Sequence, residues 1–159
     1  MSRWEQVIDK AKELRRDFHS DAQPLQETFQ KICDANNIKI VYAPSGEHAY
    51  QGESESEIVL PLGTSRARDN FTIAHELGHI FLRHKPDDRG VFRRGGKNTQ
   101  EEIEANLFAA EFLMPKVEFS EAARKVNFDE ASLANEFEVS KTAALVRMSA
   151  LKLTPQSRS

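Results

Sequence analysis

Several features that define whole classes of protein are missing from this chain of 159 residues. A single cysteine, Cys33, excludes an internal disulfide bond and a cysteine-rich metal site. No apolar stretch comes close to the roughly 20 residues that a membrane-spanning helix needs, so we expect no contact with a membrane. The first 18 residues mix acidic and basic side chains and lack an apolar export signal, which predicts a cytoplasmic protein.

A large charge of either sign is also missing. The 22 Lys and Arg residues nearly balance the 25 Asp and Glu residues, which leaves a net charge of −3 at pH 7. This balance gives no general attraction to nucleic acid, so we expect no direct nucleic-acid partner. The composition, 39% hydrophobic and 30% charged, is that of an ordinary globular protein. The length predicts one domain over residues 1–159.

The spacing of apolar residues predicts helices on both sides of a short run of strands. Spacings of three and four residues predict helices at 4–18 and 24–33, and short β-branched runs predict strands at 38–42, 49–51 and 57–60. Helical spacing then returns, and it predicts further helices at residues 66–83, 99–114, 117–126, 129–137 and 140–151. This order predicts an α+β fold with a small antiparallel or mixed sheet.

We divide the expected domain into three regions. Residues 1–36 form N-terminal helices, residues 37–115 hold the strands and the candidate site, and residues 116–153 form a C-terminal helical pair. A basic, glycine-containing segment at 85–97 lies in the second region. It is either a solvated loop or a lid that contacts substrate.

The most informative motif is His75-Glu76-Leu77-Gly78-His79, in the predicted helix at 66–83. Four residues advance a helix by one turn and about 40°, so both imidazoles project from one face and can share one Zn²⁺. Glu76 can reach a water molecule at the metal and act as a general base. The apolar neighbours predict a buried helix, in which this set without a metal would leave a charge and ring nitrogens in need of partners. We therefore predict one zinc ion per chain.

Two histidines leave a catalytic zinc one protein ligand short. His84 lies nine residues after His75, about 180° round the helix, and the spacing also rules out the metzincin pattern. We expect His84 to be a cation near the C-terminal end of the helix. The third ligand is then expected among the glutamates of residues 99–114.

Helical periodicity sorts these glutamates. The apolar residues that we take as the buried stripe of this helix are Ile103, Leu107, Ala110 and Met114. Glu104 and Glu111 then share a flank that suits water, whereas Glu102 and Asn106 share the other flank above apolar residues. We therefore expect Glu102 to be the third zinc ligand. Asn106 is placed to orient a ligand histidine through its ring N–H, as outer groups of metal sites commonly do.

Together these motifs resemble the ImmA/IrrE family of bacterial and phage metallopeptidases. The resemblance is carried by residues 71–79, by the Glu-x-x-Ala-Asn pattern within 102–110, and by the Leu-Met-Pro sequence at 113–115. It implies a fold with a zincin-like active-site helix. Most of the chain, from the strand near residue 38 to the helices that end near residue 151, takes part in it.

The resemblance also implies a chemistry and a partner. It places zinc on His75, His79 and Glu102 and makes Glu76 catalytic. The implied substrate is a protein, typically a helix-turn-helix repressor whose cleavage induces mobile-element or stress genes. Two alternatives stay open: a regulatory protein that captures a repressor or toxin without cutting it, and a direct DNA-binding regulator.

The DNA-binding alternative depends on residues 133–148, which have the look of a helix-turn-helix with Ser140 as the cap of its second helix. Glu138 stands at the turn position where a glycine is usual. Residues 121–151 contain four Lys or Arg and five Asp or Glu, so the basic surface that DNA binding needs is missing. Core packing or substrate docking is therefore the preferred role of this segment.

Overall fold

The computed structural model describes residues 1–44, 48–51, 55–86, 91–93 and 99–154. It confirms the α+β class, and every helix and strand predicted from the sequence is present, with bounds that differ by at most three residues at either end. The described elements are α1 (Arg3–Phe18), α2 (Leu25–Asn36), β1 (Ile38–Tyr42), β2 (His48–Gln51), β3 (Ser56–Leu60), α3 (Arg66–Phe81), β4 (Val91–Arg93), α4 (Gln100–Leu113), α5 (Lys116–Lys125), α6 (Glu130–Phe137) and α7 (Lys141–Ala150).

The four described strands form one mixed sheet in the order β1-β3-β2-β4. Strand β1 runs parallel to β3, with Ile40 beside Ile58, whereas β2 runs antiparallel to both β3 and β4. Strand β4 falls within residues 85–97, where the sequence analysis expects only a loop. A strand of three residues is too short to show the period-two alternation on which the prediction depends. Residues 87–90 and 94–97 of the possible lid lie outside the described residues.

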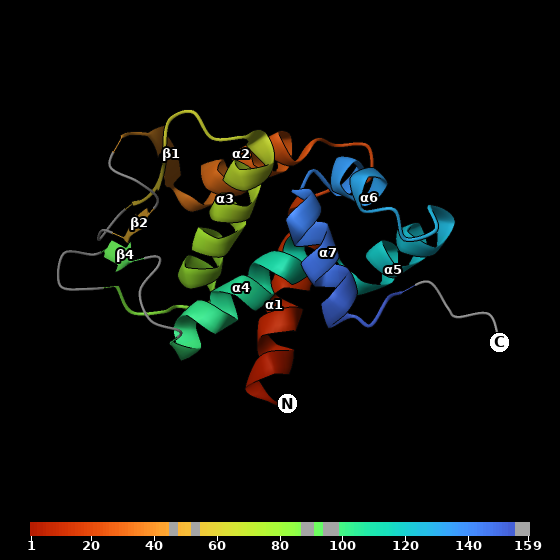
Figure 1. Cartoon of the computed structure of the whole chain (residues 1–159). Helices are drawn as coiled ribbons and strands as arrows, with labels where there is room; N and C mark the ends of the chain where they lie inside the picture. Colours follow the sequence, from red (N-terminus) through yellow and green to blue (C-terminus); the bar gives the residue numbers. More distant parts are fainter. Residues whose placement is uncertain (45–47, 52–54, 87–90, 94–98, 155–159) are drawn as a thin grey trace.

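Helix α3 is central to the fold and packs closely against α4 (Figure 1). Gly78 explains how close the two helices come. A Cβ atom at this position would lie 3.2 Å from Cα of Ala105 and 3.2 Å from side-chain atoms of Phe108, which is tighter than ordinary van der Waals contact. The glycine of the His-Glu-x-Gly-His sequence therefore lets the backbone of α4 approach the face of α3 next to the histidines.

A continuous hydrophobic cluster joins the N-terminal and C-terminal helices to this pair. It includes Val7 of α1, Phe29 of α2, Phe112 of α4, Leu133 of α6 and Met148 of α7. No helix in the described part of the chain is both long enough and apolar enough to cross a membrane.

The C-terminal pair α6 and α7 is fastened to the core by polar contacts as well. Glu138, between the two helices, has a left-handed backbone with φ of 57°. Its carbonyl oxygen accepts a hydrogen bond from Nδ2 of Asn70 at 2.9 Å, and its carboxylate accepts one from the backbone N–H of Leu25 at 3.0 Å. Arg147 of α7 is 6% exposed and pairs with Glu111 of α4 at 2.8 Å. This helix pair is therefore packed as part of the core.

Candidate metal centre

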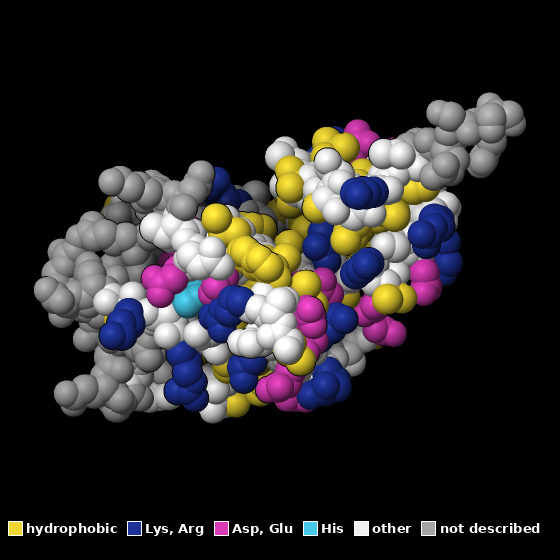
Figure 2. Space-filling view, turned by 90° about the horizontal axis from the view of Figure 1, so that it is seen from below, with side chains coloured by type: hydrophobic (Ala, Val, Ile, Leu, Met, Phe, Trp, Pro, Cys, Tyr) yellow, Lys and Arg dark blue, Asp and Glu magenta, His cyan; other side chains and the backbone are white. Residues whose placement is uncertain are grey.

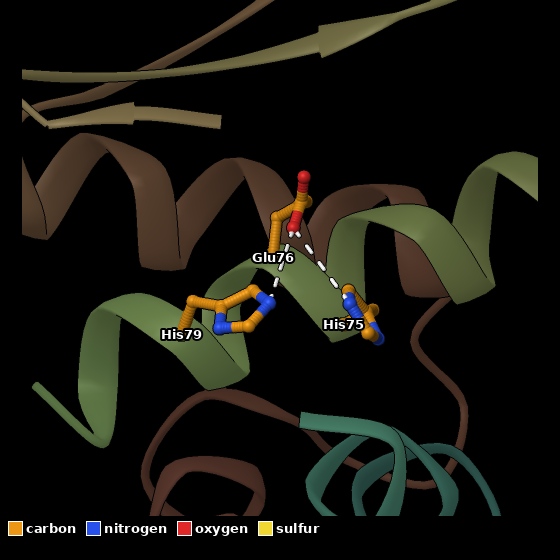
Figure 3. Close-up of side chains that lie close together, drawn as sticks. All are labelled: His75, Glu76 and His79. Atoms are coloured by element: carbon orange, nitrogen blue, oxygen red, sulfur yellow. Dashed lines mark ion pairs between the residues drawn. The ribbon is translucent and has the colours of Figure 1, made fainter. Parts of the chain in front are cut away.

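Helix α3 carries the His-Glu-His motif within its buried part. Ser65 caps the helix, because its hydroxyl accepts a hydrogen bond from the backbone N–H of Arg68. The side chains of His75, Glu76 and His79 are almost completely buried, and the ring centroids of the two histidines are 4.9 Å apart. The spacing of four residues thus brings both imidazoles to one face of the helix, with the Glu76 carboxylate near both (Figure 3).

Glu102 of α4 reaches the same two rings. Its Oε2 lies 2.6 Å from Nε2 of His79, and its Oε1 lies 3.4 Å from Nε2 of His75. Thr99 starts α4 by accepting a hydrogen bond from the backbone N–H of Glu102. The structure therefore brings together the three residues that we expect to bind zinc. Their role as ligands stays a prediction.

The buried face of α4 differs from the expected one. Its buried apolar residues are Ala105, Phe108, Ala109, Phe112 and Leu113. Of the four residues expected in the buried stripe, only Met114 is buried. Glu104 and Glu111, expected on a solvated flank, are 4% and 3% exposed, because each is paired with an arginine of another helix, Arg3 and Arg147 respectively. The spacing of residues within α4 cannot indicate ion pairs with distant helices, so it does not predict the burial of these two glutamates.

Asn106 contacts His75 although the asparagine is exposed rather than buried. Nδ1 of His75 lies 2.8 Å from Oδ1 of Asn106. Because an amide oxygen only accepts, Nδ1 donates, and a neutral ring then carries its lone pair on Nε2. Among the described residues this buried Nε2 has no hydrogen-bond partner. A buried nitrogen with a lone pair aimed at two other ligand groups fits a metal.

His79 is supported by groups that the sequence analysis does not predict. Its Nδ1 lies 2.8 Å from Nδ1 of His84, and Nε2 of His84 lies 2.8 Å from Oε1 of Glu104. Arg3 of α1 in turn donates to both oxygens of Glu104, at 2.9 and 2.8 Å, and Gln100 donates a further hydrogen bond. His84 therefore makes buried contacts to His79 and Glu104, which its expected role as a cation near the end of the helix does not include.

Electrostatics favour a divalent cation here. Burial, reinforced by the neighbouring His75, lowers the pKa of His79 to about 4, so the ring is neutral at pH 7. Burial raises the pKa of Glu102, but the neighbouring His75 and His79 outweigh this effect, and the pKa lies below its ordinary value. Hydrogen bonds from Arg3 lower the pKa of Glu104 to about 2 against the opposing effect of burial. A neutral His79 thus stands beside ionised carboxylates.

The donor set suits zinc in a catalytic rather than a structural site. Two imidazole nitrogens and one carboxylate are a common protein ligand set for catalytic zinc, and they leave a fourth position open.

In the face seen in Figure 2, a histidine side chain is visible between acidic side chains, next to a band of hydrophobic side chains. This face therefore offers both polar and apolar groups to an approaching ligand.

Comparisons with known proteins identify the fold and the family of this chain. A solved structure described as a Mycobacterium tuberculosis transcriptional regulator has the same fold, with a TM-score of 0.70 at 18% sequence identity. The match covers 91% of this chain and 46% of that one, so this chain spans less than half of that protein. A search of curated proteins found no match. The sequence profile of the M78 peptidases, described as the IrrE N-terminal-like domain, matches residues 33–149. The chain therefore belongs to the M78 peptidase family with an IrrE N-terminal-like domain.

Proposed function

We propose that this chain is a zinc-dependent endopeptidase of the cytoplasm and a single metallopeptidase domain over residues 1–159. In this proposal His75, His79 and Glu102 bind one zinc ion, Glu76 is catalytic, and Asn106 orients His75. The observation that carries the proposal is the convergence of two buried imidazoles and a carboxylate, with Nε2 of His79 2.6 Å and Nε2 of His75 3.4 Å from the oxygens of Glu102.

Zinc held in this way would supply Lewis acidity toward a peptide carbonyl and a water molecule. The proton transfers fall to Glu76. Its Oε1 lies 4.0 Å from Nε2 of His75 and 3.9 Å from Nε2 of His79, too far for a direct hydrogen bond and close enough to contact a water molecule between them. Glu76 would take a proton from this water as it attacks the carbonyl carbon, and would pass it to the nitrogen of the leaving amine.

The substrate that we propose is a helix-turn-helix repressor, whose cleavage would induce mobile-element or stress genes. Membership of a peptidase family supports a protein substrate. The similar M. tuberculosis structure is described as a transcriptional regulator, which links this fold to gene regulation. Our proposal takes the repressor as a separate polypeptide.

Direct DNA binding by α6 and α7 has less support. Arg147, the arginine of α7, is buried against Glu111 and also donates to the carbonyl oxygen of Met114 at 3.0 Å. An arginine used in this way is not available for phosphate contacts, which supply most of the affinity of DNA-binding proteins. The capture of a repressor without cleavage is the remaining alternative, and the next experiment separates it from proteolysis.

The test is to incubate the purified protein with the transcription factor encoded beside its gene and to follow fragments by mass spectrometry. We expect Glu76→Gln to keep zinc and lower the cleavage rate by about 10²- to 10⁴-fold or more, because the same carboxylate serves both proton transfers. Glu101→Gln, on the exposed side of α4, is the matched control and should cleave normally. Cleavage by Glu76→Gln at the wild-type rate would reject the proposed base, and binding without cleavage by the wild type would favour capture.

A further inference from the structure

A continuous chain of side chains leads from the metal centre to the first helix of the protein. It runs from His79 on α3 to His84, then to Glu104 on α4 and to Arg3 on α1, with hydrogen-bond distances between 2.8 and 2.9 Å. His84 and Glu104 are 6% and 4% exposed. Buried polar groups that are all hydrogen-bonded hold one another in defined orientations.

The Glu104 carboxylate fixes the direction of the hydrogen bond at the far end of this chain, and a neutral His84 passes that direction on to His79. The Glu104 carboxylate can only accept, so Nε2 of His84 donates to it. A neutral His84 then carries its lone pair on Nδ1 and accepts from Nδ1 of His79. The proton of His79 is thereby held on Nδ1, and its lone pair is on Nε2, the nitrogen that faces Glu102.

Glu104 is itself held from several sides. Arg3 binds both carboxylate oxygens, a bidentate arrangement that is stronger and more strictly oriented than a single hydrogen bond. Gln100 donates to Oε2 at 3.1 Å from one turn earlier in α4. The orientation of His84 therefore depends on a carboxylate that cannot rotate freely.

We propose that His84 and Glu104, clamped by Arg3, are positioning residues that fix the ring orientation and proton position of His79 for metal binding. The inference rests on the proposed zinc site. It also extends the metal centre beyond residues 33–149 that the family profile matches, because Arg3 belongs to α1. A carboxylate linked through an imidazole to a ligand histidine would also raise the basicity of that ligand.

A purely structural role predicts a different result. In that case the chain would only fasten the segment after α3, and its loss would lower the stability of the metal-free protein without changing the metal affinity of the folded protein. The two roles are therefore separated by measuring metal affinity and metal-free stability on the same variants.

The experiment uses the full chain after metal removal and measures Zn²⁺ affinity by chelator competition, the visible spectrum with Co²⁺, and the melting temperature without metal. We expect His84→Leu and the isosteric Glu104→Gln to weaken Zn²⁺ binding by about 10- to 100-fold, as losses of outer groups do. Both should alter the Co²⁺ spectrum. Arg3→Met should have a smaller effect, and Arg3→Lys should restore part of it.

Controls separate failure of this inference from failure of the proposed function. Glu101→Gln, on the same helix as Glu104, should match the wild type in all three measurements. A wild-type protein that binds neither Zn²⁺ nor Co²⁺ would overturn both proposals. Tight binding by the wild type with equal affinity in His84→Leu and Glu104→Gln would overturn only the positioning role. If His84→Leu fails to fold, Glu104→Gln decides the question, because it preserves the shape of the side chain and removes its charge and one acceptor oxygen.

Discussion

The two histidines of the candidate metal centre are supported in very different ways. Nδ1 of His75 meets one neutral amide, that of the exposed Asn106. Nδ1 of His79 meets a series of three groups, the buried His84 and Glu104 followed by the exposed Arg3 of α1. We call Asn106 the short arm, and we call His84, Glu104 and Arg3 together the long arm. The short arm joins two helices, whereas the long arm joins three. The orientation of His75 therefore depends on local geometry, and that of His79 depends on the assembly of the fold.

This difference has an energetic side. An exposed hydrogen bond contributes little net free energy, because water replaces the lost partner. A buried carboxylate that loses its partner has no water to replace it, which costs considerably more. Loss of the short arm should therefore lower mainly the metal affinity. Loss of the long arm should lower both the metal affinity and the stability of the fold.

The largest expected effect comes from removing the proposed ligands themselves. His75→Ala and His79→Ala should both lose zinc, measured as metal content by elemental analysis. His79→Ala should also lower the stability of the metal-free protein by about 1–3 kcal/mol more than His75→Ala does, because it additionally leaves the buried His84 without its hydrogen-bond partner. Equal stability of the two metal-free variants in denaturant titrations would remove the distinction between the arms.

Chelation of the wild-type protein tests the same site without a mutation. Since the metal would join α3 to α4, its removal should lower the melting temperature. The shift is read from thermal melts with and without excess chelator. An unchanged melting curve together with no zinc in the purified protein would contradict the metal site.

A smaller effect is expected from Asn106→Ala, which removes the short arm. Zinc affinity should fall by about 10-fold and no more than 100-fold, the usual range for an outer group. The melting temperature of the metal-free protein should stay within experimental error, because Asn106 is exposed. Asn106→Asp keeps an acceptor oxygen and should recover most of the affinity in the same chelator competition.

Gly78→Ala should disturb both arms at once, because Glu104 and Asn106 both come from α4. The new methyl group would meet Ala105 and Phe108 at 3.2 Å, which costs about 1–3 kcal/mol. The gain in helix propensity offsets up to about 1 kcal/mol of this. We expect a modest net loss of stability in denaturant titrations and weaker zinc binding. A more stable variant with unchanged affinity would show that α4 can shift without affecting the site.

The smallest effect is expected at Cys33, which belongs to neither arm. Burial raises the pKa of its thiol to about 12, so the reactive thiolate is nearly absent at neutral pH. A thiol reagent should leave the folded wild type unmodified. Because Cys33 lies in the common core, its labelling rate should increase in His84→Leu, if the long arm stabilises the fold, and stay low in Asn106→Ala.

Local patterns were enough to predict most of the secondary structure. The spacing of apolar residues predicted α3 and the strands, and the i, i+4 spacing placed His75 and His79 on one face. Glu102 lies at the histidines although the buried stripe of α4 was assigned to the wrong residues. The choice of Glu102 used that stripe to set Glu104 and Glu111 aside; the part of the reasoning that does not depend on the stripe is that Glu102 and Asn106, one turn apart, share a flank.

The long arm could not be predicted in this way. Arg3 and Glu104 are 101 positions apart in the sequence, and nothing in the local pattern of either residue indicates the other. A charged residue at a helix flank is usually solvated, so the expectation for Glu104 was reasonable and wrong. Only the packing of α1 against α4 makes its burial possible.

Glu138, which has a left-handed backbone, connects a segment that is synthesised early to one that is synthesised late. Pro24 precedes α2 and offers no side-chain cap, so the backbone N–H of Leu25 is capped by the Glu138 carboxylate, 113 positions after Leu25. During synthesis, α2 therefore leaves the ribosome long before the group that completes its first turn. The first turn of α2 can reach its native hydrogen bonding only after α6 has been made and docked, which couples the folding of an early helix to nearly the whole length of the protein.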